Sequence, residues 1–156
     1  MDPNALLREL KSFKEFFDRS TGCLSEEDSS FAPVEGLMTT AQIVAHVAQT
    51  VDWFIEGAFR SGGFDMDFEK YNAEIARIAS LAVAREWLDR SFATAEEVTL
   101  KHSAEEWSLP LPEGPVMGGA ARSAIFGGIN DHTAHHRGAL AVYSRLRGHV
   151  PAMPYM

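Results

Sequence analysis

The chain has 156 residues, 46% of them hydrophobic and 23% charged, a composition typical of one soluble globular domain, which we expect over residues 1–156. Its formal net charge of -8, without a basic cluster, disfavours nucleic acid and anionic membranes as partners. The single cysteine excludes an internal disulfide and a cysteine-rich metal site. With no signal-peptide pattern after Met1 and no long uncharged apolar run, we expect a cytoplasmic protein.

Apolar residues recur at helical spacing in the first half of the chain. The first helix is predicted from about Pro3 to Ser20, with proline at an early helical position. A loop rich in serine and acidic residues follows. The second helix begins after Thr39, a predicted N-cap with Gln42 as its capping-box partner. It ends near Ser61-Gly62-Gly63.

The second half predicts one short helix and two long ones. The short helical stretch lies around Phe68 to Ile78, and the third long helix runs from Leu81 to about Lys101. A loop with several prolines and glycines leads into the last helix, from about Ala121 to Arg147, which Gly148 ends. No strand-like alternation is present. Four long helices in one small domain predict an all-α protein, a four-helix bundle.

Two histidines, His132 and His136, lie one turn apart on the predicted inner face of the last helix. Residues i and i+4 project from the same side of a helix, so the two imidazoles can bind one ion. Gly128 and Ala139 flank them, and such small side chains leave room for a pocket. Buried imidazole nitrogens need partners, and a metal ion would satisfy one nitrogen on each ring.

A third histidine, His46, lies at the edge of the apolar face of the second helix. A lone histidine in such a helix is more often an ordinary packed residue, but the pair on the last helix favours a shared metal site. Three protein ligands leave a coordination position open, as in catalytic sites. We predict that His46, His132 and His136 bind the metal, beside a pocket formed by Thr50, Trp53, Gly128 and Tyr143.

Other features of the last helix bear on the class of protein and on its assembly. A zinc peptidase needs glutamate directly after the first histidine, where this chain has Thr133, so that class is excluded. His135 points away from the pair, and we expect it to pack against, or hydrogen-bond to, another helix. The opposite side carries small residues that permit close approach of a second backbone, which favours a homodimer over tight packing within one subunit: Gly127, Ala134, Gly138 and Ala141.

Several segments resemble the DinB-like superfamily. The resemblance is close in the second helix and the C-terminal third, in the runs Thr39-Thr40-Ala41-Gln42-Ile43-Val44-Ala45-His46, His132 to Gly138, Tyr143 to Gly148 and Pro151 to Tyr155. It implies a four-helix bundle, commonly dimeric, that holds a divalent ion, often nickel or zinc, on three histidines matching His46, His132 and His136. Ala139 departs from the pattern, since glutamine often follows the Arg-Gly pair in the family.

Characterised members of that family include enzymes that use low-molecular-weight thiols such as bacillithiol or mycothiol. The resemblance therefore implies a metal-dependent transferase that joins a thiol to a small electrophilic molecule. Metal coordination favours the thiolate, which is the nucleophile. Hydrolysis by metal-bound water, and a non-catalytic metal- or ligand-binding stress-response protein, remain alternatives. No catalytic residue is assigned.

Overall fold

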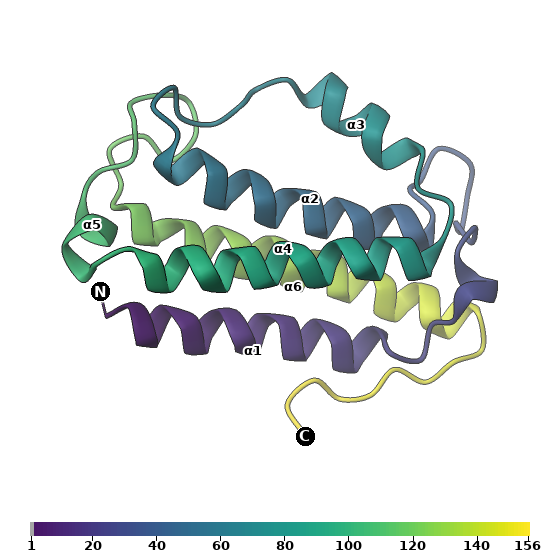
Figure 1. Cartoon of the computed structure of the whole chain (residues 1–156). Helices are drawn as coiled ribbons and strands as arrows, with labels where there is room; N and C mark the ends of the chain where they lie inside the picture. The colour runs from purple at the N-terminus through teal and green to yellow at the C-terminus, as the bar shows by residue number, and fades with distance from the viewer. Residues whose placement is uncertain (1) are drawn as a thin grey trace.

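The computed structural model describes residues 2–156 as a helical bundle with no β-strand in that range. Two short α-helices and two 3-10 turns join four long helices (Figure 1). The long helices are α1 (Pro3–Thr21), α2 (Thr40–Phe59), α4 (Leu81–Lys101) and α6 (Ile125–Leu146), and the shorter elements are η1 (Glu26–Asp28), α3 (Phe68–Ala76), α5 (Ala104–Ser108) and η2 (Arg122–Ala124). The predicted all-α fold is confirmed.

Local capping residues determine where the helices begin. The predicted capping box of α2 is present, since the Gln42 backbone N–H donates to Thr39 Oγ1 at 3.3 Å and the Thr39 N–H donates to Gln42 Oε1 at 2.9 Å. Ser80 caps α4 by accepting a hydrogen bond from the Val83 N–H. Gly148, at a positive φ of 82°, follows the last helix. These signals are local, and the sequence therefore located the long helices closely.

Two features of the second half differ from the sequence prediction. Residues 122–124 form a 3-10 turn, so that α6 begins at Ile125, after the predicted start near Ala121. The short helix α5, capped by Ser103 and Glu106, was not predicted. A helix of five residues is too short to show a periodic apolar pattern. Its Trp107 is fully buried and donates its indole N–H to the Thr99 carbonyl at 3.1 Å.

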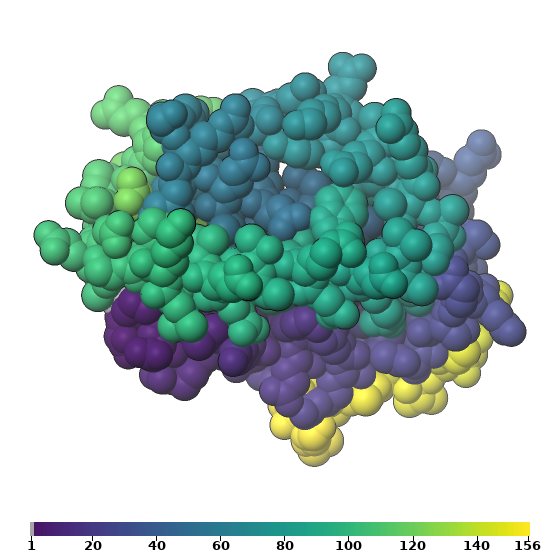
Figure 2. Space-filling model, viewed as in Figure 1, coloured from purple at the N-terminus to yellow at the C-terminus, as the bar shows by residue number. Residues whose placement is uncertain are grey.

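The helix α2 lies at the centre of the bundle and packs against α4 and α6, while α1 packs against the other faces of those two helices. Most of α2 is buried, which matches its high content of alanine, valine and isoleucine. The short helix α3 lies outside the bundle, across α2 (Figure 1). The surface is hollowed between α2, α3 and α4 (Figure 2).

None of the helices within residues 2–156 combines the length and the apolarity that a membrane span requires.

Candidate metal centre

The three predicted histidines converge from two helices. His46 comes from α2, and His132 and His136 come from successive turns of α6. One ring nitrogen from each lies within 4.8 Å of the others. His46 Nε2 and His132 Nε2 are 3.1 Å apart, and the three ring centroids are separated by 4.5 to 4.8 Å. The packing of α2 against α6 therefore assembles a group that could hold a metal ion.

The spacing of these nitrogens suits a small cation. Two imidazole nitrogens on one tetrahedral zinc ion, each about 2.0–2.1 Å from it, lie about 3.3 Å apart. The separation of 3.1 Å between His46 Nε2 and His132 Nε2 is close to that value. The ligand atoms of the whole group lie within 4.8 Å of one another, so the third nitrogen is farther away than the first two but on the same side of the cluster.

The electrostatics keep all three rings in the form that binds metal. Burial lowers the pKa of His46 below its usual value. Burial, together with the neighbouring imidazoles, lowers the pKa of His132 to about 3 and that of His136 to about 4. The rings are therefore neutral near pH 7, and each offers a nitrogen lone pair. In the absence of an ion, one Nε2 of the His46–His132 pair can donate to the other across their 3.1 Å contact, whereas a bound cation would accept the lone pairs of both.

Hydrogen bonding leaves part of this cluster unsatisfied. The Nδ1 atom of His46 is buried and has no hydrogen-bond partner among residues 2–156. Near His132, the Thr50 hydroxyl lies 3.4 Å from Nε2. In a neutral imidazole, each ring nitrogen is either a donor or an acceptor. With one nitrogen of each ring turned toward the others, the three rings cannot all form hydrogen bonds with one another. The residues present fit a divalent ion on three imidazoles.

A cavity of about 370 Å³ lies beside His46 and His132. Three of the four predicted pocket residues, Thr50, Trp53 and Gly128, line it. The helix α3 covers it with side chains that the sequence analysis did not identify, Phe68, Tyr71 and Asn72, and Gln49 and Phe54 of α2 complete much of the wall. A helix that lies across the bundle gives no periodic signal that would assign its residues to a site.

Tyr143 is not part of this cavity, contrary to the sequence prediction. It lies two helical turns beyond His136, roughly 10 Å along the axis. Its ring packs edge-on against Phe31 with a centroid distance of 5.6 Å, and its hydroxyl donates to the Met38 carbonyl at 3.1 Å. A wheel projection superimposes residues that lie at different heights along a helix, which is why the sequence placed Tyr143 beside the histidines.

Gly128 has a different role from the one expected. A Cβ atom added there would lie 2.6 Å from Cζ of Phe54. The missing side chain therefore admits the Phe54 ring and does not leave empty volume. The indole of Trp53 is held by a 2.7 Å hydrogen bond from Nε1 to the Asp65 carbonyl and by the Phe64 ring, whose centroid is 4.7 Å away. The cavity wall is thus built from packed aromatic rings.

The sequence predicted that His135 packs against another helix or hydrogen-bonds to it, but it does not pack there. It is exposed, and its ring lies edge-on to His136 at a centroid distance of 4.9 Å. Asp131, which precedes His132, is also exposed, but it lines the cavity. The chain therefore places one carboxylate in the wall next to the histidine cluster.

Comparison with known protein families identifies a match. The family model described as the DinB superfamily matches residues 13–140, a range that includes His46, His132 and His136. No curated protein matches the sequence.

Proposed function

The chain belongs to the DinB superfamily, and from this membership and the histidine cluster we propose that it binds a divalent metal ion, zinc or nickel, through His46, His132 and His136. We propose further that it is a transferase that joins a low-molecular-weight thiol to a small electrophilic substrate in the cytoplasm. The observation that carries the proposal is the convergence of three neutral imidazoles, two of which, His46 and His132, line a cavity of about 370 Å³.

In the proposed reaction, the three histidines would bind the metal ion and the aromatic wall of the cavity would bind the electrophile. The three imidazoles hold the ion, which when bound would lower the pKa of a thiol and favour the nucleophilic thiolate. The aromatic wall, including Trp53 and Phe68, would exclude water and orient the electrophile next to the thiol. Because the imidazoles are neutral ligands, the full positive charge of the ion remains available to the thiolate.

A hydrolase is the second candidate, and one observation favours it. Asp131 lines the cavity, and a carboxylate there could accept a proton from an attacking water. In the transferase such a base is not needed, since coordination itself favours the thiolate. The hydrolase therefore requires the Asp131 carboxylate, whereas the transferase does not.

The decisive experiment uses protein purified without an affinity tag, with its metal identified by elemental analysis. It is incubated with a model electrophile, with and without a panel of low-molecular-weight thiols, and the conjugates are measured by mass spectrometry. We expect thiol-dependent conjugation that is lost on chelation and on His132→Ala replacement, and that Asp131→Asn preserves. Metal-loaded protein without any thiol-dependent turnover would contradict the transferase, and ester or amide hydrolysis lost in Asp131→Asn would favour the hydrolase.

We also propose that two chains associate through the small-residue face of α6. In a single chain, Cβ atoms added at Gly127 and Gly138 would meet nothing within 4 Å. Tight packing within the subunit therefore does not account for these glycines, which supports a contact with a second copy. Light scattering after size exclusion should give twice the chain mass, and replacement of Gly138 by Leu should give the monomer.

A further inference from the structure

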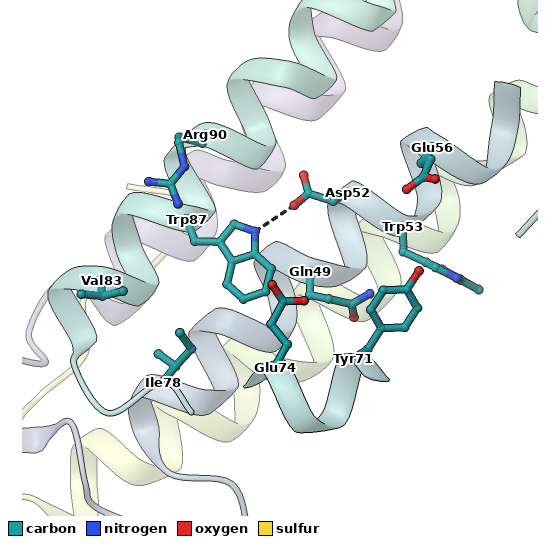
Figure 3. A pocket seen from close by; sticks show the side chains of 10 residues that line it. All are labelled: Gln49, Asp52, Trp53, Glu56, Tyr71, Glu74, Ile78, Val83, Trp87 and Arg90. Atoms are coloured by element: carbon teal, nitrogen blue, oxygen red, sulfur yellow. Dashed lines mark hydrogen bonds between the residues drawn. The ribbon is translucent and has the colours of Figure 1, made fainter. Parts of the chain in front are cut away.

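A second cavity, of about 400 Å³, lies under α3 on the side toward α4 (Figure 3). We call it the α4-side cavity. Its lining comes from α2, α3, the segment that follows α3, and α4. Gln49, Trp53 and Tyr71 line this cavity and the one beside the histidines, and so form the partition between the two. The three histidines do not line the α4-side cavity.

Gln49 is the most informative residue of this partition. It is only 7% exposed, yet its side-chain amide has no hydrogen-bond partner among residues 2–156. Figure 3 shows the side chain projecting from α2 toward Tyr71 and Glu74 of α3. Buried amides in proteins are nearly always hydrogen-bonded, because an unpaired one loses its bonds to water without replacement. Because Gln49 lines the cavity, its amide, which pairs with no group of the protein, is available to hydrogen-bond a polar occupant.

The charge of the lining favours a cation. Three carboxylates, Asp52, Glu56 and Glu74, face one guanidinium, Arg90. The Arg90 side chain is 67% exposed and lies 4.0 Å from Glu86, outside the lining. The Glu56 carboxylate lies 3.9 Å from Arg60, whereas Glu74 makes no ion pair within the described range. The cavity therefore carries excess negative charge.

The aromatic residues favour an organic cation over a metal ion. Trp87 donates its indole N–H to Asp52 Oδ2 at 2.8 Å, which fixes the ring and the carboxylate next to each other (Figure 3). Trp53 and Tyr71 complete the aromatic wall. The faces of indole rings attract ammonium groups through their quadrupole, most strongly where water is excluded. Lys70 Nζ already lies 5.2 Å from the Tyr71 ring centroid, and Trp53 packs against Phe64. Trp87 makes no ring contact within the described residues, so its indole is the face available to a ligand.

We propose that the α4-side cavity binds an organic ammonium ion of about the size of choline. Asp52 and Glu74 balance its charge, the indole of Trp87 contacts its alkyl groups, and the Gln49 amide pairs with its hydroxyl or N–H group. The site does not depend on the metal. Only the side chains of Gln49, Trp53 and Tyr71 separate the α4-side cavity from the cavity beside the histidines. A ligand, or part of a substrate, bound there would therefore lie close to the reacting groups of the proposed function.

The first test compares two probes of the same shape on the full-length protein. Choline is titrated against its neutral carbon isostere, dimethylbutanol, by isothermal calorimetry and by tryptophan fluorescence. We expect choline to bind in the millimolar range or tighter, and the isostere to bind at least roughly fivefold more weakly because it lacks the charge. Equal binding of the two probes, or no binding of choline, would overturn the proposal.

The second test locates the site by substitution. Glu74→Gln and Asp52→Asn should each weaken choline binding by roughly threefold or more, and Trp87→Leu should abolish it. Glu69→Gln removes the same charge from α3 at an exposed position outside the lining, and should leave binding unchanged. If Glu69→Gln weakens binding as much as Glu74→Gln, the attraction is a general effect of the acidic surface and the site is wrong.

Two controls keep this test separate from the proposed function. Glu74 is exposed, so its replacement should leave the fold intact even if Asp52→Asn does not fold. Choline binding should survive chelation and the His46→Ala replacement, because the histidines do not line the α4-side cavity. Loss of choline binding on chelation would show that the probe occupies the metal centre instead, and would also overturn the proposal.

Discussion

His46 Nε2 lies 3.1 Å from His132 Nε2, although 86 residues separate the two in the chain. This contact joins the central helix α2 to the last helix α6, and it brings a histidine that would otherwise be an ordinary core residue into the cluster.

Replacement of His46 by alanine should strongly reduce metal binding. It removes the ligand that α2 contributes and leaves only the pair on α6, which can supply two of the four positions of a tetrahedral site. We expect affinity to fall by more than the roughly hundredfold that loss of a supporting hydrogen bond costs a metal site. Metal content after dialysis measures this. The exposed His135→Ala replacement is the matched control, and equal loss in both variants, or no loss in His46→Ala, would contradict the three-ligand site.

The metal-free protein should lose stability as the pH falls below 6.5. The pKa of His132 is about 3 and that of His136 about 4 in the folded state, against a usual value of 6.5. The unfolded chain therefore binds protons first on acidification, and the stability falls as the pH is lowered from 6.5 to about 3, where His132 of the folded protein is also protonated. Urea unfolding of chelated protein at several pH values checks this.

The His132→Ala variant provides the comparison for that measurement. It lacks the group with the larger shift, so its stability should depend less steeply on pH in the same window. An identical slope in wild type and variant would show that the histidine cluster is not the source.

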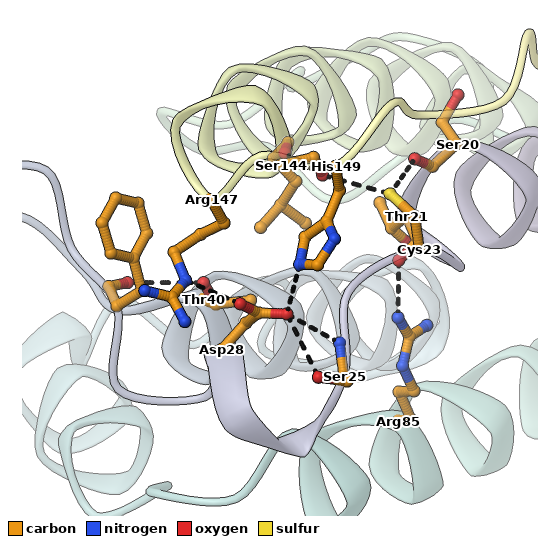
Figure 4. A network of polar contacts seen from close by, with 12 residues as sticks. Ser20, Thr21, Cys23, Ser25, Asp28, Thr40, Arg85, Ser144, Arg147 and His149 are labelled. Atoms are coloured by element: carbon orange, nitrogen blue, oxygen red, sulfur yellow. Dashed lines mark hydrogen bonds and ion pairs between the residues drawn. The ribbon is translucent and has the colours of Figure 1, made fainter.

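A buried carboxylate, Asp28, joins the first loop to the C-terminal segment (Figure 4). It accepts a hydrogen bond from Arg147 Nε at 2.7 Å and lies 3.1 Å from His149 Nε2. Burial alone would raise the pKa of Asp28, but the backbone N–H of Ser25 and the side chains of Arg147 and His149 outweigh it and lower the pKa to about 2. The ionised carboxylate is thus stabilised in the folded state.

The Asp28→Asn replacement should destabilise the protein at neutral pH by about 2–3 kcal/mol, the value of the lowering of the pKa from 3.8 to about 2 converted at about 1.4 kcal/mol per unit. Because the folded pKa is lowered, this contribution is present above about pH 3.8 and is lost as the pH falls toward 2. Urea unfolding at pH 7 and near pH 2.5 should show a difference that shrinks on acidification. The exposed Glu35→Gln replacement is the control, and a loss of equal size there would count against the network.

The Gly128→Ala replacement should destabilise the bundle by about 1–3 kcal/mol, as overpacking usually does. The added Cβ would lie 2.6 Å from the Phe54 ring, which would have to move into the cavity that it lines. A smaller side chain in Phe54→Leu should reduce the cost. A double-mutant cycle measured by thermal unfolding tests this coupling. If the two changes in the free energy of unfolding are strictly additive, the added methyl group does not clash with Phe54.

Much of the fold could be predicted because its signals are local. The capping box of Thr39 and Gln42, the serine before α4 and the glycine after α6 act within a few residues, so they locate helix ends without knowledge of the tertiary structure. The i, i+4 spacing of His132 and His136 likewise fixes their common direction. The sequence therefore predicted the bundle and the pair of facing imidazoles.

The surroundings of the site could not be predicted in the same way. The helical wheel placed Tyr143 with the histidines, but it contains no information on height along the helix. The sequence indicated empty space beside Gly128, because the Phe54 ring that fills this space belongs to another helix. The residues of α3 that cover the cavity carry no local signal, since their position depends on how that helix lies across α2.

The sequence by itself determined the helices, their caps, the acidic character and the facing pair His132 and His136, because each of these depends on residue type and short-range spacing; His46 was added to the pair through the family resemblance. Only the tertiary structure decided that His46 faces His132, that Asp131 and the α3 residues line the neighbouring cavity, and that Gln49 is buried without a partner. The physical reason is that side chains from different helices meet only when the apolar faces of those helices pack together, and their relative heights and rotations are set by that packing.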